Sequence, residues 1–331
     1  MENIVPKLLE VGGKYILKKI IRSKPDRTYT LLCVELGHRR CKIALIKINS
    51  GTYSIEQIGD LTKTKPEETE KFLQPNGFVS FIDHMKQIQQ RLQHDNSIKK
   101  VDGMAFSLCC PVNSEDGVID IDGLLGWSPD IREILHQNTG QENIVIVNDA
   151  VAFALGCQDD VQVMRGLKLP ILCLTFGGGI GSSFIQNGKS INNSIIHKNK
   201  YFVQASEVGD IWKIWENGFE GSPHMLAGQA FFDWASNETG WDKREKKLSF
   251  SERIAWIIAA IREKGTHQFN SVIIGGGYAN EYVDKSKIEY LQKKCKLSLA
   301  LRTELPLYGI AKIWLQRFHY DKSISNLISD S

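Results

Sequence analysis

The stretch from Ile144 to Gly156, IVIVNDAVAFALG, decides the fold. Its first four residues are β-branched and predict a short buried strand, and the helix formers from Ala150 onward predict a helix that follows at once. Asn148 and Asp149 lie between the two. In α/β folds the carboxyl end of a strand opens into a crevice where reacting groups are placed. Either residue could instead serve only as the helix N-cap, because Asn and Asp are favoured there.

Length and composition are those of an ordinary globular protein of about two domains. The chain has 331 residues, 42% of them hydrophobic, and a net charge of +3, which indicates neither a nucleic acid nor an acidic partner. Its seven cysteines form no CxxC pair, which favours reduced thiols in the cytoplasm over disulfides or zinc. With no run of about 20 apolar residues and no signal-peptide core, we expect no membrane contact.

The first half begins with a basic extension, residues 1–27, whose apolar residues between 8 and 21 could form an amphipathic helix. We expect this helix to pack on the domain or on a partner subunit rather than on a membrane. From Tyr29 the pattern of strands and glycine turns predicts an antiparallel meander, with Glu35 and Gly37 at its first turn. Such a hairpin can cradle a phosphate.

The rest of the chain alternates helices with strands that end in glycines. Apolar residues at helical spacing predict a core helix at 77–93, and a buried strand follows at 101–108. The strand at 171–176 runs into a glycine-rich turn, which is either a phosphate loop or a common β-hairpin. Another strand, at 271–277, ends in three glycines where a nucleotide could approach closely. Because each half opens with strand, glycine turn and strand, we expect a duplicated α/β architecture around a cleft.

Taken in order, these motifs resemble the ROK family of sugar kinases and related repressors, within the actin and hexokinase-like superfamily. The resemblance covers about residues 29–315 and implies a two-lobed α/β fold with a cleft between the lobes. The small lobe would comprise residues 28–149 with a C-terminal helix at 308–320, and the large lobe residues 150–307. The segments that carry the resemblance are Val34–Lys42, Cys109–Val112, Asn148–Ala150, Gly177–Gly181, Glu207–Asp210 and Ile274–Gly277.

The resemblance implies phosphorylation of a hexose or related sugar with ATP and Mg²⁺. Asp149 would be the general base that takes the proton of the attacking sugar hydroxyl, and an ordinary carboxylate pKa would suffice, because phosphoryl transfer relies mainly on positioning and charge neutralisation. The residues implied to bind the sugar are Asn148, Glu207, Asp210 and His224. Those implied to hold the nucleotide and its metal are Glu35, Gly37, Arg39, Lys42, Gly177, Gly178, Gly179, Gly181, Gly276 and Gly277.

Two of these assignments have an alternative that the sequence leaves open. Glu207 could form only a surface salt bridge, and His224, at the position of a sugar-binding glutamate in the family, could be only a surface histidine.

The first phosphate loop departs from the family pattern. Glu35 replaces an aspartate, and His38 and Arg39 occupy the positions of a Gly-Thr pair. In the second loop Gly178 replaces a threonine. Bulky side chains would block a close backbone approach, whereas Arg39 and Arg40 could bind a phosphate themselves.

These departures leave two further functions open. One is a sensor that binds sugar or nucleotide without catalysis, and the other is a kinase that uses polyphosphate in place of ATP. A transcriptional regulator is disfavoured, because the 27-residue extension is too short for a DNA-binding domain.

The family's structural zinc is predicted to be absent. Trp215, Asn217 and Ser222 stand where its cysteines would be, and Asp210 replaces its histidine, so a tetrahedral thiolate site cannot form. Family members are often dimers, and the apolar residues between 8 and 21 would suit a homodimer contact. The sequence decides neither the oligomeric state nor the identity of the sugar.

Overall fold

The computed structural model describes most of both halves of the chain. Several sequence predictions lie outside the described residues: the extension, the sugar-binding residues Glu207, Asp210 and His224, and the zinc positions Trp215, Asn217 and Ser222. The described residues are 27–50, 54–110, 112–113, 118–119, 130–158, 165–185, 213–214, 220–221, 227–228, 243–264, 268–302 and 306–319.

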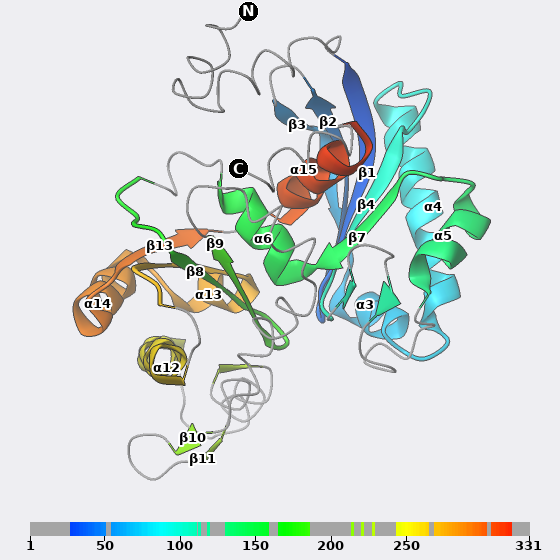
Figure 1. Cartoon of the computed structure of the whole chain (residues 1–331). Coiled ribbons are helices and arrows are strands. Elements are labelled where there is room, and N and C mark those ends of the chain that lie inside the picture. Colours follow the sequence, from blue (N-terminus) through cyan, green and yellow to red (C-terminus); the bar gives the residue numbers. More distant parts are fainter. Residues whose placement is uncertain are drawn as a thin grey trace, which may run out of the picture.

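A five-stranded mixed sheet with the order β3-β2-β1-β4-β7 forms the first half (Figure 1). Its antiparallel meander consists of β1 (Thr28–Leu36), β2 (Cys41–Asn49) and β3 (Ile55–Lys63), which confirms the predicted meander. Two strands continue the sheet in parallel with β1, namely β4 (Gly103–Leu108) and β7 (Ile144–Asn148).

Helices cover both faces of this sheet because its strands alternate their side chains between two cores. On β1, Leu32 and Val34 join one core and Leu31 and Cys33 join the other. The first core contains apolar residues of α4 (Gly77–Asp95), the helix predicted at 77–93. Two further helices lie on this side, α3 (Pro66–Phe72), whose mostly charged sequence does not predict a helix, and α5 (Ile131–Thr139).

A four-stranded sheet with the order β13-β12-β8-β9 forms the second half. The glycine-rich turn joins β8 (Ile171–Phe176) to β9 (Ile180–Ile185) as an antiparallel hairpin, and β12 (Ser271–Gly275) and β13 (Ser298–Arg302) run parallel to β8. On the outer face of this sheet lie the helices α12 (Lys243–Lys264), α13 (Gly277–Tyr282) and α14 (Lys285–Cys295).

Two helices pack between the sheets and share one core with both (Figure 1). They are α6 (Asp149–Gln158) and α15 (Pro306–His319). Gly309 permits their close approach, because a Cβ added there would clash with the carbonyl oxygen of Ala152. The helix predicted at 308–320 is therefore α15, although the exact lobe boundaries remain a prediction.

Two short hairpins complete the described elements. The first pairs β5 (Val112–Asn113) with β6 (Val118–Ile119), and the second pairs β10 (Lys213–Ile214) with β11 (Glu220–Gly221). Among the helices that the structure describes, none is both long and apolar enough to span a membrane.

Candidate active site

Asp149 is the first residue of α6 and directly follows the buried strand β7. The backbone N–H of Ala150 donates to Oδ1 of Asp149 at 2.8 Å and to Oδ1 of Asn148 at 3.0 Å. The Asn148 amide also donates from Nδ2 to the carbonyl oxygen of Cys110 at 3.0 Å. These bonds fix the junction between β7 and α6 and hold Asp149 in one orientation. Asn148 thus has the position and the hydrogen bond of an N-cap residue, and Asp149 is the first residue of the helix that it caps.

The environment of Asp149 raises the pKa of its carboxyl group to about 7. Loss of solvent on burial is the main cause, and the negative charge of Glu35 acts in the same direction. Backbone N–H groups of Ala150 and of Asp149 itself oppose the rise. The proposed chemistry does not require this shift, yet a carboxyl group that titrates near neutrality is well suited to accept a proton there.

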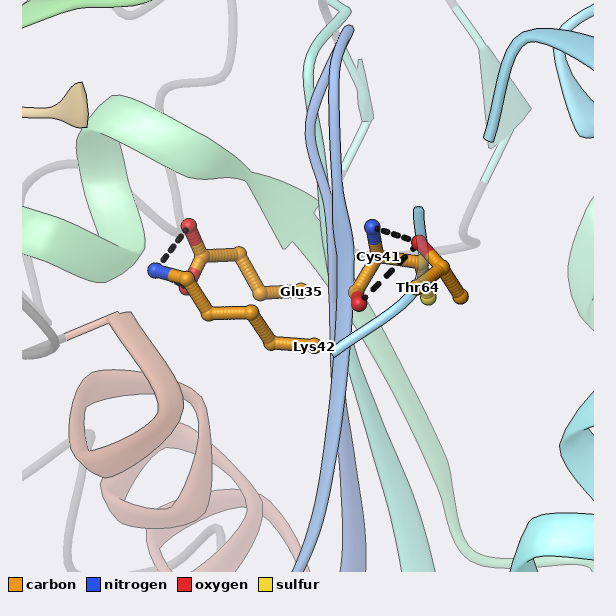
Figure 2. A network of polar contacts seen from close by, with 4 residues as sticks. All are labelled: Glu35, Cys41, Lys42 and Thr64. Carbon is orange, nitrogen blue, oxygen red and sulfur yellow. Dashed lines mark hydrogen bonds and ion pairs between the residues drawn. The ribbon is translucent and has the colours of Figure 1, made fainter. Parts of the chain in front are cut away.

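Glu35 and Lys42 occupy the first loop as an ion pair. They are directly opposite each other on β1 and β2, and Nζ of Lys42 lies 3.0 and 3.2 Å from the two carboxylate oxygens of Glu35. Figure 2 shows both side chains extending to the side of the sheet on which α6 lies. Both are mostly buried, with 17% of the Glu35 side chain and 19% of the Lys42 side chain exposed. Lys42 therefore compensates the charge of Glu35 close to Asp149.

Hydrogen bonds fix the start of β2 beside this pair (Figure 2). The backbone N–H of Cys41 donates to Oγ1 of Thr64 at 2.8 Å, and Thr64 shares a 2.6 Å hydrogen bond with Thr69 of α3. At the turn itself, the N–H of Gly37 donates to the carbonyl oxygen of Arg40 at 3.0 Å. Hydrogen bonds thus fix both ends of the turn that carries His38 and Arg39.

The second loop approaches Asp149 through Gly181. The N–H of Gly177 donates to the carbonyl oxygen of Gly179 at 3.0 Å, which closes the β8–β9 turn. A Cβ added at Gly181 would lie 2.9 Å from the Cβ of Ala150 and 3.5 Å from Oδ1 of Asp149. Only glycine lets the hairpin approach the start of α6 this closely, so the loop and the carboxyl group form one site.

The glycines after β12 lie at the end of the neighbouring strand β8. Gly276 has a positive φ of 94°, and a Cβ there would be 2.6 Å from the backbone nitrogen of Phe176. Gly277 begins α13, is exposed, and has nothing within 4 Å of the position of an added Cβ. The adenosine contact expected of these residues has open space in front of Gly277.

The structure therefore brings together part of the predicted site that it describes. Asp149, Asn148, Glu35, Lys42 and Gly181 lie near the start of α6. Arg39 instead reaches across to α13, where its Cζ lies 5.4 Å from the centroid of the Tyr278 ring.

Sequence reasoning missed two contributors to the site. The carbonyl group of Cys110 holds Asn148, and although Cys109–Val112 is one of the segments that carry the family resemblance, no role was assigned to it. Tyr278 could have been found as the aromatic residue directly after the Gly275–Gly277 run.

The structure describes the residues expected at the magnesium site but not those at the predicted zinc positions. Among the described residues, no group of three or more His, Cys, Asp and Glu side chains could hold a metal ion. Because the zinc positions lie outside those residues, the absence of zinc stays a prediction. A magnesium ion that arrives with a nucleotide requires only one or two carboxylates, because phosphates and water supply its other ligands. Glu35, to which the family resemblance assigns the metal, is one such carboxylate.

Comparison with known proteins defines the fold as that of the ROK sugar kinases and regulators, as the sequence resemblance implied. No family model and no curated protein matched the chain. Among solved structures, the inorganic polyphosphate/ATP-glucomannokinase from Arthrobacter sp. strain KM superposes with a TM-score of 0.60 at 18% identity, covering 87% of this chain and 99% of that protein.

Two other solved structures superpose similarly. A ROK family glucokinase from Streptomyces griseus, in complex with glucose and AMPPNP, has a TM-score of 0.59 at 17% identity over 86% of this chain and 98% of its own. A ROK family transcriptional regulator, a homolog of the E. coli MLC protein, has a TM-score of 0.58 at 16% identity over 90% and 83%. Because kinases and a regulator share the fold, the fold alone does not decide the activity.

Proposed function

We propose that this protein is a kinase that transfers a phosphoryl group from ATP to a hydroxyl group of a hexose or related sugar, with Asp149 as the general base. The observation that carries the proposal is the position of Asp149. Its carboxyl group lies at the carboxyl end of a buried strand, next to a glycine loop, in surroundings that raise its pKa to about 7. The shared fold with ROK kinases supports the same activity.

In the proposed reaction, the oxygen of the sugar hydroxyl attacks the γ-phosphorus. The bond between that phosphorus and the bridging oxygen of ATP breaks, and ADP leaves with the bonding electrons. Oδ1 of Asp149 accepts the Ala150 N–H, so the second oxygen, Oδ2, is the proton acceptor. At neutral pH about half of the Asp149 carboxyl groups are ionised, which allows them to take the proton and to release it to solvent afterwards.

Glu35 and Lys42 are suited to handle the charge of the donor. Glu35 would help to hold Mg²⁺, whose positive charge would neutralise the transferring phosphates. Lys42 keeps Glu35 in place through both carboxylate oxygens and contributes a further positive charge. The β8–β9 hairpin approaches Asp149 at Gly181, and its glycine-rich turn would bind the phosphates of the donor.

The sugar contacts belong to the same proposal. Within the part of the chain that the structure describes, Asn148 uses one amide hydrogen and one acceptor site, and its second hydrogen and remaining lone pair would bind a sugar hydroxyl. Glu207, Asp210 and His224 would supply further hydroxyl contacts.

A second candidate function is a sugar sensor that has lost the donor reaction. The contacts of the first turn favour it, because His38 packs against Gly178 and Arg39 lies over Tyr278. Both contacts lie where the family resemblance implies a nucleotide. The sensor would bind a sugar without responding to ATP and Mg²⁺.

A thermal-shift panel separates the two functions, because a ligand of the folded state raises the melting temperature by mass action. The panel contains glucose, mannose, fructose, N-acetylated hexosamines and disaccharides, each with and without ATP and Mg²⁺. A kinase gives a shift with one sugar and a further shift with the nucleotide. A sugar shift that ATP never increases contradicts the kinase proposal and supports the sensor, and polyphosphate is then the next donor to add.

A further inference from the structure

The turn between β1 and β2 packs directly on the turn between β8 and β9. A Cβ added at Gly178 would clash with the Cβ of His38 and would lie 2.7 Å from its Cδ2. The family pattern has a small residue at position 38 and a threonine at position 178, whereas this chain has histidine and glycine. The two departures are therefore complementary in size, because the missing side chain of Gly178 makes room for His38.

The same turn makes a second contact with the other half of the molecule. The guanidinium carbon of Arg39 lies 5.4 Å from the centroid of the Tyr278 ring, within the range of a cation–π interaction. Tyr278 is on α13, immediately after the glycines that follow β12. Burial raises the pKa of the nearby Tyr282 hydroxyl to about 12, and the positive charge of Arg39 opposes that rise. Arg39 is thus close to two tyrosines of α13.

These two neighbouring side chains join the first sheet to both glycine segments of the second sheet. We propose that His38 and Arg39 form a clasp that holds the two halves together when no nucleotide is bound, and that a nucleotide must displace this clasp in order to bind. This inference rests on the proposed function, because it concerns access of the phosphate donor to the same site.

The clasp has a clear physical consequence for affinity. Phosphates that approach the β8–β9 turn meet the His38 side chain on Gly178, and a base that approaches Gly277 meets Arg39 on the neighbouring Tyr278. Both contacts must be broken before the donor occupies these positions, so the free energy of the clasp is subtracted from the free energy of donor binding. Removing the clasp is therefore expected to tighten donor binding.

The first test asks whether the His38–Gly178 contact exists in solution, through a double-mutant cycle on the full chain. Gly178→Ala should lower the melting temperature in the natural background, because the added methyl group displaces His38. In a His38→Gly background the same substitution should have little effect, because the space is then empty. Equal effects of Gly178→Ala in the two backgrounds would overturn the proposed contact.

The second test measures binding of MgATP by isothermal titration calorimetry to the natural chain and to a His38→Gly/Arg39→Ser double variant. We expect the double variant to bind about tenfold more tightly, equivalent to about 1.4 kcal/mol. Arg40→Ser is the matched control, because it removes an equal charge from an exposed position in the same turn. It should leave the affinity unchanged or weaken it.

The outcomes of the calorimetry are distinct. Weaker binding by the double variant would mean that Arg39 contacts the donor directly, and equal binding or none by either protein would mean that no clasp controls access; each result overturns the proposal. Because binding does not require phosphoryl transfer, a failure of the proposed catalytic role of Asp149 would appear in a turnover assay and leave this measurement intact.

Discussion

Replacing Asp149 with asparagine should stabilise the protein while removing its proposed catalytic base. The carboxyl pKa rises from 3.8 to about 7 on folding, so the folded state holds a proton between about pH 4 and pH 7 that the unfolded state has released. The contribution of this group to the free energy of unfolding is therefore fully present below about pH 4, and it is lost as the pH rises through about 7. Asparagine keeps the shape and the acceptor for the Ala150 N–H but never carries the charge.

The two pKa values set the size of the effect. At about 1.36 kcal/mol per pKa unit, the charged Asp149 costs the folded protein about 4 kcal/mol at pH 8 and about 2 kcal/mol at pH 5. These are upper limits, because Asp149 is only partly buried and solvent screens its charge. We expect Asp149→Asn to be about 2 to 4 kcal/mol more stable than the natural chain at pH 8, with the difference roughly halved at pH 5.

Urea unfolding of both proteins at several pH values between about 5 and 8 measures this difference, because all other titrating groups are shared. Two results would refute the argument that burial and Glu35 destabilise the charged form of Asp149. One is a stability difference that does not change with pH, and the other is a natural chain that is more stable than the variant at pH 8.

Two other predictions test the surroundings of Asp149 and the helix layer. Glu35→Gln removes a charge that raises the pKa of Asp149, so the rise of kcat/KM with pH should move below about pH 7. Lys42→Met leaves the charge of Glu35 uncompensated, so it should move the rise to higher pH. Shifts of the two variants in the same direction would contradict an electrostatic influence of Glu35 and Lys42 on Asp149. Gly309→Ala should destabilise the protein by about 1 to 3 kcal/mol in urea unfolding, since its methyl group would clash with the Ala152 carbonyl group; unchanged stability would show that α6 and α15 do not pack this closely.

Local patterns in the sequence predicted much of the fold. The β-branched run before Asn148 predicted the buried strand β7, and the apolar spacing of α4 predicted a core helix, because these structures bury those side chains best. Helix α3 was missed for the opposite reason. Its residues are mostly charged, and its start depends on a capping contact between Lys65 and Glu68 and on Pro66, which are weaker signals than a hydrophobic stripe.

The candidate site was predictable in its parts and less so in its contacts. The glycine runs and the Asn148–Asp149 pair indicated where backbone and carboxylate would meet a ligand. The ion pair of Glu35 with Lys42 follows from strand register, which the sequence does not specify by itself. The reach of Arg39 to Tyr278 depends on how two distant segments pack, so no local pattern could reveal it.

In the proposed reaction, Asp149 takes a proton from a sugar hydroxyl during transfer from ATP. The most direct measurement incubates the natural chain and Asp149→Asn with ATP, Mg²⁺ and the sugar that gives the largest thermal shift, and quantifies sugar phosphate by mass spectrometry. The natural chain should form the sugar phosphate, and Asp149→Asn should form it more slowly by about 10² to 10⁴-fold, the usual contribution of a general base. Equal rates for the two proteins would contradict this role of Asp149.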